Sequence, residues 1–262
     1  MRSDAERSMP QVAAKRVEEA GLNALQTQRQ IFYDGWVLRV SPGSAKRGRS
    51  VNACFGSSLP LPRKIAHCES VYARQGLPVL FRLTPFDHPA GLDDALAEQG
   101  YEAFGETLVQ TLALELPPEI PDADDDVELG VPDAPAFVDA VADLRGSTAR
   151  EREAHLERLG NSVLEKRYCV VRVAGRVVCT SQVALDGELA GVFDVITAPD
   201  ARGRGYATLA CASLLSWAWQ HGAQAAYLQV SADNAPAIAT YRKFGFATAY
   251  TYHYRGRPGA CE

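Results

Sequence analysis

The sequence lacks the features that mark several large classes of protein. No apolar run approaches the roughly 20 residues that a membrane-spanning helix needs, and the start of the chain has no apolar core of a signal peptide. The 262 residues carry a formal net charge of −5, whereas a general nucleic-acid binder needs clustered lysines and arginines. We therefore expect a cytoplasmic protein whose partners include neither nucleic acid nor a membrane.

Metal-ligand motifs are also lacking. The chain has neither a CxxC pair nor an HExxH helix, and its five histidines are scattered. Its six cysteines show no close pairing and mostly lie in apolar stretches, which is typical of buried thiols in a reducing compartment. They are Cys54, Cys68, Cys169, Cys179, Cys211 and Cys261. We expect no metal site.

The length of the chain fits two domains, joined by a linker. The Pro-rich, acidic segment PPEIPDADDD, residues 117–126, is typical of an exposed linker and divides the chain into domains at residues 1–116 and 127–262. In the first domain the sequence pattern predicts helices over residues 12–20, 62–75 and 92–99, and strands over residues 31–40, 50–55, 78–84 and 107–116. The runs 31–40 and 50–55 suggest a hairpin with a long basic loop.

The second domain shows a clearer α/β pattern. Tight turns at two Xaa-Gly pairs separate the strands of an antiparallel meander over residues 168–173, 176–184 and 188–197. Around it the pattern predicts strands over 127–130, 225–230 and 246–254, and helices over 134–143, 148–158, 205–221 and 236–244. This order predicts a mixed sheet in an α/β (α+β) fold. A strand, a helix and Gly-aromatic recur in both domains, which indicates either a repeated plan or a chance similarity.

The stretch GVFDVITAPDARGRGYA, residues 191–207, has the parts of an anion site. A buried strand leads through a glycine-rich loop into an apolar helix, and the glycines let a ligand approach the backbone closely. No Ser, Thr, Asp or Asn stands where it could cap the first N–H groups of the helix. A phosphate or pyrophosphate would satisfy them. The loop is neither GxGxxG, since Thr208 occupies the last glycine position, nor a P-loop, since no Lys-Ser/Thr pair follows.

The surroundings of this loop make it more specific. Arg202-x-x-Gly205-x-Ala207 follows a strand that ends three residues before Asp200, and Asn234 and Tyr241 follow on the next strand-helix unit. Over residues 123–256 this arrangement resembles the acyl-CoA site of the GNAT superfamily of N-acetyltransferases. The resemblance implies acetyl-CoA as the acyl donor and a complete GNAT fold in the second domain.

The resemblance also assigns roles to residues of the cofactor site. The backbone amides of residues 202–207 would hold the pyrophosphate of coenzyme A, the strand end at residues 195–197 would pair with the pantetheine amides, Asn234 would contact the pantetheine arm, and Tyr241 would lie near the thioester sulfur. The cofactor-binding candidates are Val195, Ile196, Thr197, Arg202, Gly203, Arg204, Gly205, Tyr206, Ala207 and Asn234.

The implied mechanism is direct attack of a neutral amine on the thioester. An ordinary tyrosine, with a pKa of about 10, is suited to protonate a departing thiolate, so Tyr241 is our candidate acid, unless its ring is simply packed in the core. Some members of the family carry a Glu base where this chain has Gln229, which cannot take a proton and which we assign to substrate binding. Asp194 in its apolar strand is the candidate base, because burial raises a carboxyl pKa. The alternatives are deprotonation through water, and an Asp194 that pairs with an arginine.

The first domain resembles the leading half of GNAT-related proteins with two tandem halves, of which the first is degenerate; mycothiol synthase has a comparable layout. The resemblance rests on YDGWVLRVSPGSAKRGRSVNACF, residues 33–55, and such a half would shape the acceptor site. The candidates for holding a carboxylate or other polar acceptor are Trp36, Arg39, Arg47, Arg49 and Asn52. The alternative is an exposed basic loop without a ligand.

The sequence therefore predicts an acetyl-CoA-dependent N-acetyltransferase that acts on a primary amine of a small molecule, amino acid or peptide. The alternative is a non-catalytic acyl-CoA sensor, which the missing Glu at Gln229 favours and which the presence of Tyr241 opposes. The sequence leaves the oligomeric state open, a homodimer included.

Overall fold

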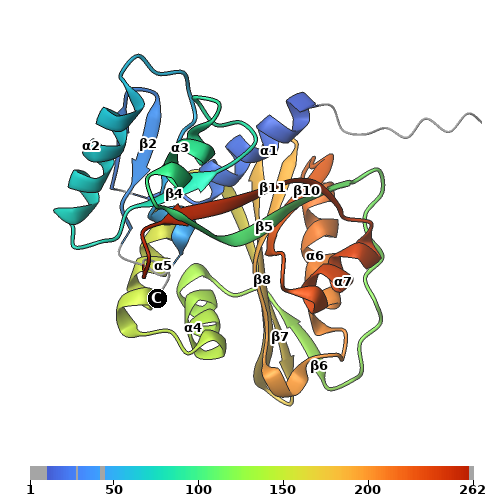
Figure 1. The fold of residues 1–262 in the computed structure, drawn as a ribbon. Coiled ribbons are helices and arrows are strands. Elements are labelled where there is room, and N and C mark those ends of the chain that lie inside the picture. Colours follow the sequence, from blue (N-terminus) through green and yellow to red (C-terminus); the bar gives the residue numbers. More distant parts are fainter. Residues whose placement is uncertain (1–10, 28, 42–44, 260–262) are drawn as a thin grey trace, which may run out of the picture.

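A computed structural model describes residues 11–27, 29–41 and 45–259, which form one mixed β-sheet with helices on its faces (Figure 1). Within these residues the sheet has 11 strands in the order β1-β2-β3-β4-β11-β5-β10-β9-β8-β7-β6. The strands are β1 (Gln30–Tyr33), β2 (Trp36–Arg39), β3 (Val51–Asn52), β4 (Leu80–Leu83), β5 (Glu102–Ala113), β6 (Val127–Gly130), β7 (Glu165–Val173), β8 (Arg176–Asp186), β9 (Leu189–Thr197), β10 (Ala225–Ser231) and β11 (Ala247–Gly256). The predicted α/β class with a mixed sheet is confirmed.

The helices begin and end largely where local signals place them. They are α1 (Gln11–Ala24), α2 (Leu61–Ala73), α3 (Leu92–Glu98), α4 (Ala134–Arg145), α5 (Ala149–Gly160), α6 (Tyr206–Gln220) and α7 (Ala235–Phe244), with short 3-10 helices at Lys46–Gly48 and Pro199–Ala201. Side chains cap α4, α5 and α7: Asp133, Thr148 and Asn234 each accept a bond from a backbone N–H of the first turn. None of the described helices is both long and apolar enough to cross a membrane.

The strand order is symmetric about the central pair β11–β5. On one side of this pair lie β4, β3 and β2, on the other β10, β9 and β8, and in both series the first two strands are parallel and the next pair is antiparallel. A helix, α2 or α6, joins the two parallel strands, and a second helix, α3 or α7, leads to the central strand. The halves therefore share one supersecondary plan, as the weak sequence repeat suggested.

The two halves exchange their last strands. β5, from the first half, pairs along β10 from Ala225↔Ala113 to Ser231↔Thr107, and β11, from the second half, pairs with β4. Figure 1 shows β5 and β11 side by side between the two halves. The exposed segment of residues 117–126 contains no helix or strand. The division at this segment stays a prediction, because β5 precedes it and yet lies among strands that follow it.

A buried ion pair joins the halves behind the central strands. Glu18 of α1 accepts hydrogen bonds from the guanidinium of Arg82 on β4 and, at 2.7 Å, from the hydroxyl of Tyr250 on β11. Arg82 is 2% exposed and also lies over the ring of Tyr252, 3.8 Å from its centroid. Removing one partner would leave a buried charge without compensation, so this contact ties α1, β4 and β11 together.

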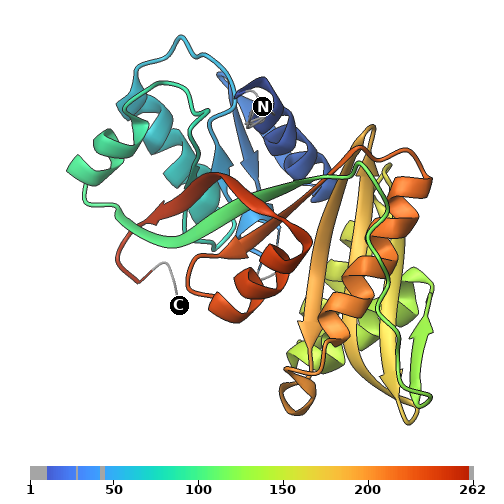
Figure 2. The same cartoon turned by 90° about the vertical axis from the view of Figure 1, so that its right-hand side faces the viewer.

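Helices cover both faces of the second half of the sheet. α6 packs on one face, in a core with β7 to β10, and α4 and α5 pack on the other through Phe137, Val138 and Leu159 against Val170 of β7. Figure 2 shows the sheet between α6 and the α4–α5 pair. β9 therefore lies between α6 on one face of the sheet and the α4–α5 pair on the other.

One sequence prediction needs correction. The run 31–40 is not one strand, because Asp34 and Gly35 adopt φ values of +44° and +82° and form a tight turn between β1 and β2. Asp-Gly is a strong signal for such a turn. The expected long-loop hairpin is present as the antiparallel pair β2–β3.

The predicted burial of the cysteines holds for most of those that the structure describes. Cys68, Cys169, Cys179 and Cys211 are buried and free, and Cys54 is free and partly buried. Cys261 lies outside the described residues.

The strand exchange predicts that the second half does not fold alone. A chain of residues 127–262 would lack β4 and β5, so β10 would lose one of its two pairing partners and β11 would lose both. We expect a single cooperative thermal transition for the full chain by circular dichroism and none for this fragment, with recovery on mixing with residues 1–126. A fragment of residues 127–262 that unfolds cooperatively would contradict the prediction.

Candidate active site

β9 and β10 separate part-way along their length. Their parallel pairing ends at Val192↔Leu228, although β9 continues to Thr197 and β10 to Ser231. On their outer edges β9 stays paired with β8 and β10 stays paired with β5. The inner edge of residues 193–197 therefore has no strand partner within the described part of the chain. Such an edge can pair with the amides of another extended molecule.

An uncapped helix start lies next to this edge. Gly203 and Gly205 have φ values of +77° and +85°, and no atom lies within 4 Å of the place where a Cβ would stand on either. Gly205 is the N-cap of α6 and offers no side-chain cap, in contrast to the caps of α4, α5 and α7. Arg202 donates from Nε to the carbonyl oxygen of Thr197 at 3.4 Å. The open space and the N–H groups of the first turn fit a phosphate or pyrophosphate.

α7 follows β10 on the other side of the gap. Asn234 is exposed and uses its Oδ1 to cap α7, accepting from the backbone N–H of Ala237 at 3.2 Å, so its amide nitrogen is left for another acceptor. Tyr241 is 8% exposed and packs edge-on against Phe246, with ring centroids 6.0 Å apart.

The environment of Tyr241 corrects one premise of its assignment. Burial, with a smaller contribution from the nearby thiols of Cys211 and Cys179, raises the pKa of the phenol well above its ordinary value. The assumption of an ordinary pKa is therefore wrong. The alternative from sequence was a Tyr241 whose ring is simply packed in the core, and the ring does pack there.

Asp194 stands at a bulge in β9. The register with β8 skips between Thr180↔Ile196 and Gln182↔Phe193, and Asp194 has a φ of +48°. This conformation turns its carboxylate toward α4 and α5.

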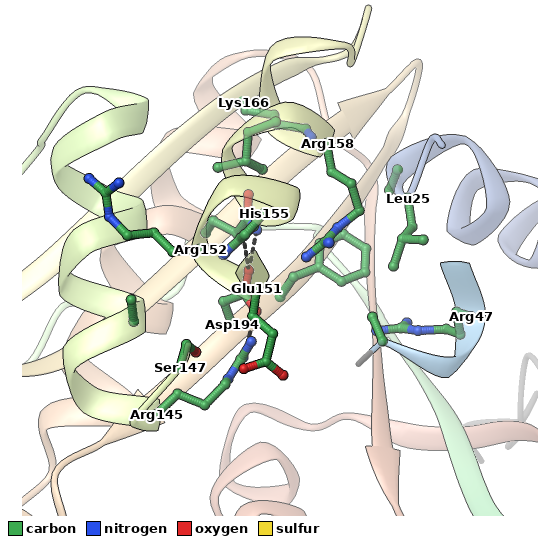
Figure 3. A pocket seen from close by; sticks show the side chains of 16 residues that line it. Leu25, Arg47, Arg145, Ser147, Glu151, Arg152, His155, Arg158, Lys166 and Asp194 are labelled. Atoms are coloured by element: carbon green, nitrogen blue, oxygen red, sulfur yellow. Dashed lines mark hydrogen bonds and ion pairs between the residues drawn. The ribbon is translucent and has the colours of Figure 1, made fainter. Parts of the chain in front are cut away.

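Three side chains surround the Asp194 carboxylate. It accepts from Arg145 Nη2 at 2.8 Å and Gln182 Nε2 at 2.5 Å, and it lies 3.2 Å from Nε2 of His155 (Figure 3). Arg145 is the last residue of α4 and His155 lies on α5, so the carboxylate joins both helices to the sheet.

These contacts overturn the expected pKa shift. Burial alone would raise the pKa of Asp194, but the hydrogen bonds and charges of His155 and Arg145 lower it far below its ordinary value. The prediction of a raised pKa is wrong, and the alternative of pairing with an arginine is correct. An ionised Asp194 only accepts hydrogen bonds, so Nε2 of His155 is the donor of this pair and Nδ1 is the ring nitrogen outside it.

A cavity of about 310 Å³ lies beside Asp194. Its walls come from α4, α5, β7 to β9, the end of α1 and the loop of the first half that carries Arg47. Figure 3 shows Arg47 and Arg158 extending into it from facing walls. The volume suits a small ligand or the end of a larger one. Of the two loop arginines proposed from sequence, Arg47 lines this cavity and Arg49 does not.

Trp36 and Arg39, proposed as acceptor ligands, lie in the interior of the first half instead. Trp36 is fully buried and donates its indole N–H to the carbonyl oxygen of His88 at 2.8 Å. Arg39 donates to the carbonyl oxygens of Leu22 and Leu25 at 2.9 and 3.0 Å, at the end of α1. Both side chains are used in holding the fold, so their assignment to substrate binding is corrected.

Asn52 and Gln229 are also outside the cavity. Asn52 is 4% exposed and donates to the carbonyl oxygen of Ser50 at 3.1 Å, and Gln229 accepts from the hydroxyl of Tyr252 at 3.0 Å. Gln229 also approaches α1 closely at Gly21. Several polar side chains that line the cavity belong to no sequence motif and were not predicted. They are Arg145, His155, Arg158, Lys166 and Gln182. The only sequence signal for these residues is that they are polar or charged and lie just before or within the predicted meander.

Comparison with known proteins identifies the family. The family described as probable histone acetyltransferase Rv0428c, C-terminal, matches residues 13–255. The chain belongs to this acetyltransferase family. The acetyltransferase is 26% identical over 222 residues to YobR of Bacillus subtilis (strain 168), an uncharacterized N-acetyltransferase, covering 84% of this chain and 89% of YobR.

Solved structures agree in fold. A GCN5-related N-acetyltransferase from Kribbella flavida superposes with a TM-score of 0.72 at 19% identity, covering 94% of this acetyltransferase and 96% of that chain. A tandem GNAT protein from the clavulanic acid biosynthesis pathway gives a TM-score of 0.62 at 16% identity, covering 74% and 68%. The predicted acetyltransferase class is confirmed, and the fold is that of GNAT proteins with the predicted tandem layout. Among the described residues, no cluster of three His, Cys, Asp or Glu side chains could hold a metal ion.

Two substitutions at Asp194 separate its charge from its backbone conformation. Asn tolerates a positive φ, so Asp194→Asn removes the charge alone and should cost about 1–3 kcal/mol of unfolding free energy. Asp194→Ala should cost about 1–2 kcal/mol more, since Ala is strained at this φ. Denaturant unfolding at pH 7 measures both.

The same variants have a defined pH dependence. Because the pKa of Asp194 is lowered on folding, its stabilisation is fully present above the unfolded-state pKa of about 3.9 and is lost as the pH falls through the lower, folded-state pKa. The difference between the parent and Asp194→Asn should therefore shrink below pH 4. A constant difference from pH 7 to pH 3 would contradict the ion pairing.

Proposed function

We propose that this acetyltransferase transfers the acetyl group of acetyl-CoA to a primary amine of a small molecule, amino acid or peptide by direct attack. The observation that carries the proposal is the unpaired edge of β9 at residues 193–197, which leads directly to the uncapped start of α6. The first feature suits an extended amide chain and the second a pyrophosphate. Coenzyme A contains both groups.

The residues of the second half fit coenzyme A in sequence order. The backbone amides of residues 202–207 would hold the pyrophosphate, with open space beside both loop glycines. The edge of Val195, Ile196 and Thr197 would pair with the pantetheine amides, and the free amide nitrogen of Asn234 would donate to the same arm. GNAT proteins normally use acetyl-CoA, and we infer the same donor here.

The acceptor would enter from the opposite face. The 310 Å³ cavity lies on the α4–α5 side of the sheet, and α6 lies on the other side (Figure 2). We infer that the two faces communicate where the pairing of β9 with β10 ends. An amine in the cavity would therefore approach the thioester from one face of the sheet, and the thioester would lie between β9 and β10 where their pairing ends.

Acetyl-CoA supplies an acyl group activated as a thioester. A backbone N–H of the free β9 edge would polarise its carbonyl, and the N–C bond would form as the C–S bond breaks. His155, oriented by Asp194, would take the amine proton at Nδ1. The hydroxyl of Tyr241 would donate its proton to the departing sulfur.

Coenzyme A should stabilise the protein, and a glycine pair on one helix tests where it binds. Gly205 and Gly222 flank α6, both have positive φ, and both have open space around them, so Ala should cause similar strain at either position. At a ligand concentration of 100 times Kd the stabilisation should be about 2.7 kcal/mol. We expect a rise in Tm for the parent and for Gly222→Ala and a much smaller one for Gly205→Ala. No rise for the parent at millimolar coenzyme A would overturn the proposal.

Two variants test the two proton transfers. In a thiol-release assay, Tyr241→Phe should lower kcat about 100-fold or more with an unchanged KM for acetyl-CoA. His155→Gln should lower kcat about 100-fold or more, because the amine loses its proton acceptor. Transfer by Tyr241→Phe at the parent rate would exclude this residue as the acid. Coenzyme A binding without thiol release on a panel of amino acids, polyamines and peptides would contradict transfer and favour a sensor.

A further inference from the structure

The candidate acceptor cavity has a charge opposite to that of the chain. Among its lining side chains are five cations, Arg47, Arg145, Arg152, Arg158 and Lys166, and two carboxylates, Glu151 and Asp194. The whole chain has a formal net charge of −5. A cationic cavity in an acidic protein gathers anions from solution.

Two of these cations are compensated by carboxylates. Arg145 pairs with Asp194 at 2.8 Å, and Arg152 pairs with Asp139 outside the cavity. Figure 3 shows Arg152 extending away from Asp194. These two arginines are therefore used in holding α4 and α5.

The other three cations have no such partner. Within the described residues, no carboxylate oxygen lies within 4.0 Å of the charged nitrogens of Arg47, Arg158 or Lys166. Arg158 donates to the carbonyl oxygen of Ala154 at 3.1 Å, and the Arg47 guanidinium lies 5.8 Å from the ring centroid of Phe193. Three uncompensated cations thus meet around one cavity, from β7, α5 and the first half of the chain.

This arrangement is unfavourable while no anion is present. Burial, with repulsion from Arg158, lowers the pKa of Lys166 to about 8, even though Asp194 opposes the shift. Burial also lowers the pKa of Arg158. An anion placed among these groups would offset both the desolvation and the mutual repulsion.

We propose that the acceptor is an amine that also carries a separate anionic group, a carboxylate or a phosphate, which Arg47, Arg158 and Lys166 bind. The inference rests on the proposed function and names its substrate class. The anionic group anchors the molecule among the cations, and the amine end reaches the gap between β9 and β10. The same positive surroundings disfavour the ammonium form, so the bound amine is held in the neutral form that attacks. A basic peptide would meet repulsion here.

Arg47 gives the degenerate first half a direct part in this recognition. In the first half the helix that corresponds to α6 is α2, which begins at Leu61 after Pro60 and not after a pair of loop glycines, so the start of α2 lacks the arrangement that is found at the start of α6. Through the 3-10 helix Lys46–Gly48 it contributes one wall of the cavity. The acceptor site is therefore complete only when both halves are present.

Matched acceptors test the charge requirement. β-Alanine and β-alaninamide differ in the charge of one end, as do phosphoethanolamine and ethanolamine, and a lysine-containing basic peptide represents the opposite class. With acetyl-CoA, we expect kcat/KM at least tenfold higher for the charged member of at least one pair, and the pair that shows it tells carboxylate from phosphate. Equal turnover within both pairs, or preference for the basic peptide, would overturn the inference.

Variants locate the effect. Arg158→Gln and Arg47→Gln should each raise the KM of the charged acceptor about 10- to 100-fold, as expected for a lost bond between charged groups, and leave the KM of acetyl-CoA unchanged. Arg150→Gln, on the exposed side of the same helix α5, is the control and should change neither. Unchanged acceptor KM in both test variants would contradict the assignment, and thermal unfolding verifies that each variant is folded.

A binding measurement separates this inference from the proposed function. Calorimetric titration of β-alanine and phosphoethanolamine into the protein with coenzyme A present requires no turnover. Binding of one of them that Arg158→Gln abolishes would support the anion site even if no acceptor were acetylated. Absence of binding by both would overturn the inference even if coenzyme A stabilised the protein.

Discussion

The unequal pairing of β10 determines most of the candidate site. β10 pairs with β5 along its whole length but with β9 only as far as Val192↔Leu228. Backbone hydrogen bonds to β5 therefore hold β10 in a direction that β9 does not follow, since β9 is held by β8 up to Thr197. Because β5 comes from the first half, the gap in the second half depends on the exchange of strands between the halves. The candidate cofactor site therefore depends on the tandem fold and not on the second half alone.

Asp194 links this gap to the acceptor cavity. It stands at the bulge where β9 leaves its regular register, and its carboxylate holds the end of α4 and the middle of α5. The positive φ that makes the bulge also turns the side chain away from the core and toward the cavity. One residue thus sets both the course of the β9 edge and the orientation of His155. Its value to the site lies in its fixed negative charge and not in a raised pKa.

Local signals in the sequence predicted what depends on neighbouring residues. The meander β7–β8–β9 followed from two turn pairs, and the uncapped start of α6 followed from Gly203, Gly205 and the missing cap residue. The turn at Asp34-Gly35 was equally local and was missed, because an apolar run on both sides of it read as one strand. The position of β5 between β10 and β11 was not predictable in this way, since no residue of β5 records which distant strand it will meet. Trp36 and Arg39 failed as ligand candidates for a related reason: residue type cannot distinguish an arginine that binds a substrate from one that ends a helix.

The candidate acceptor cavity is the clearest case of information that only the fold assembles. Arg47 lies more than a hundred residues before Arg158 and Lys166 in the sequence. None of the three belongs to a motif. Each alone reads as a solvated surface charge, which is the common role of such residues. Together they surround a cavity beside Asp194, whose carboxylate is paired with Arg145 and His155, and none of the three has an ion-pair partner of its own among the described residues. In the proposed function, the negative charge that would balance these three cations comes from the acceptor molecule.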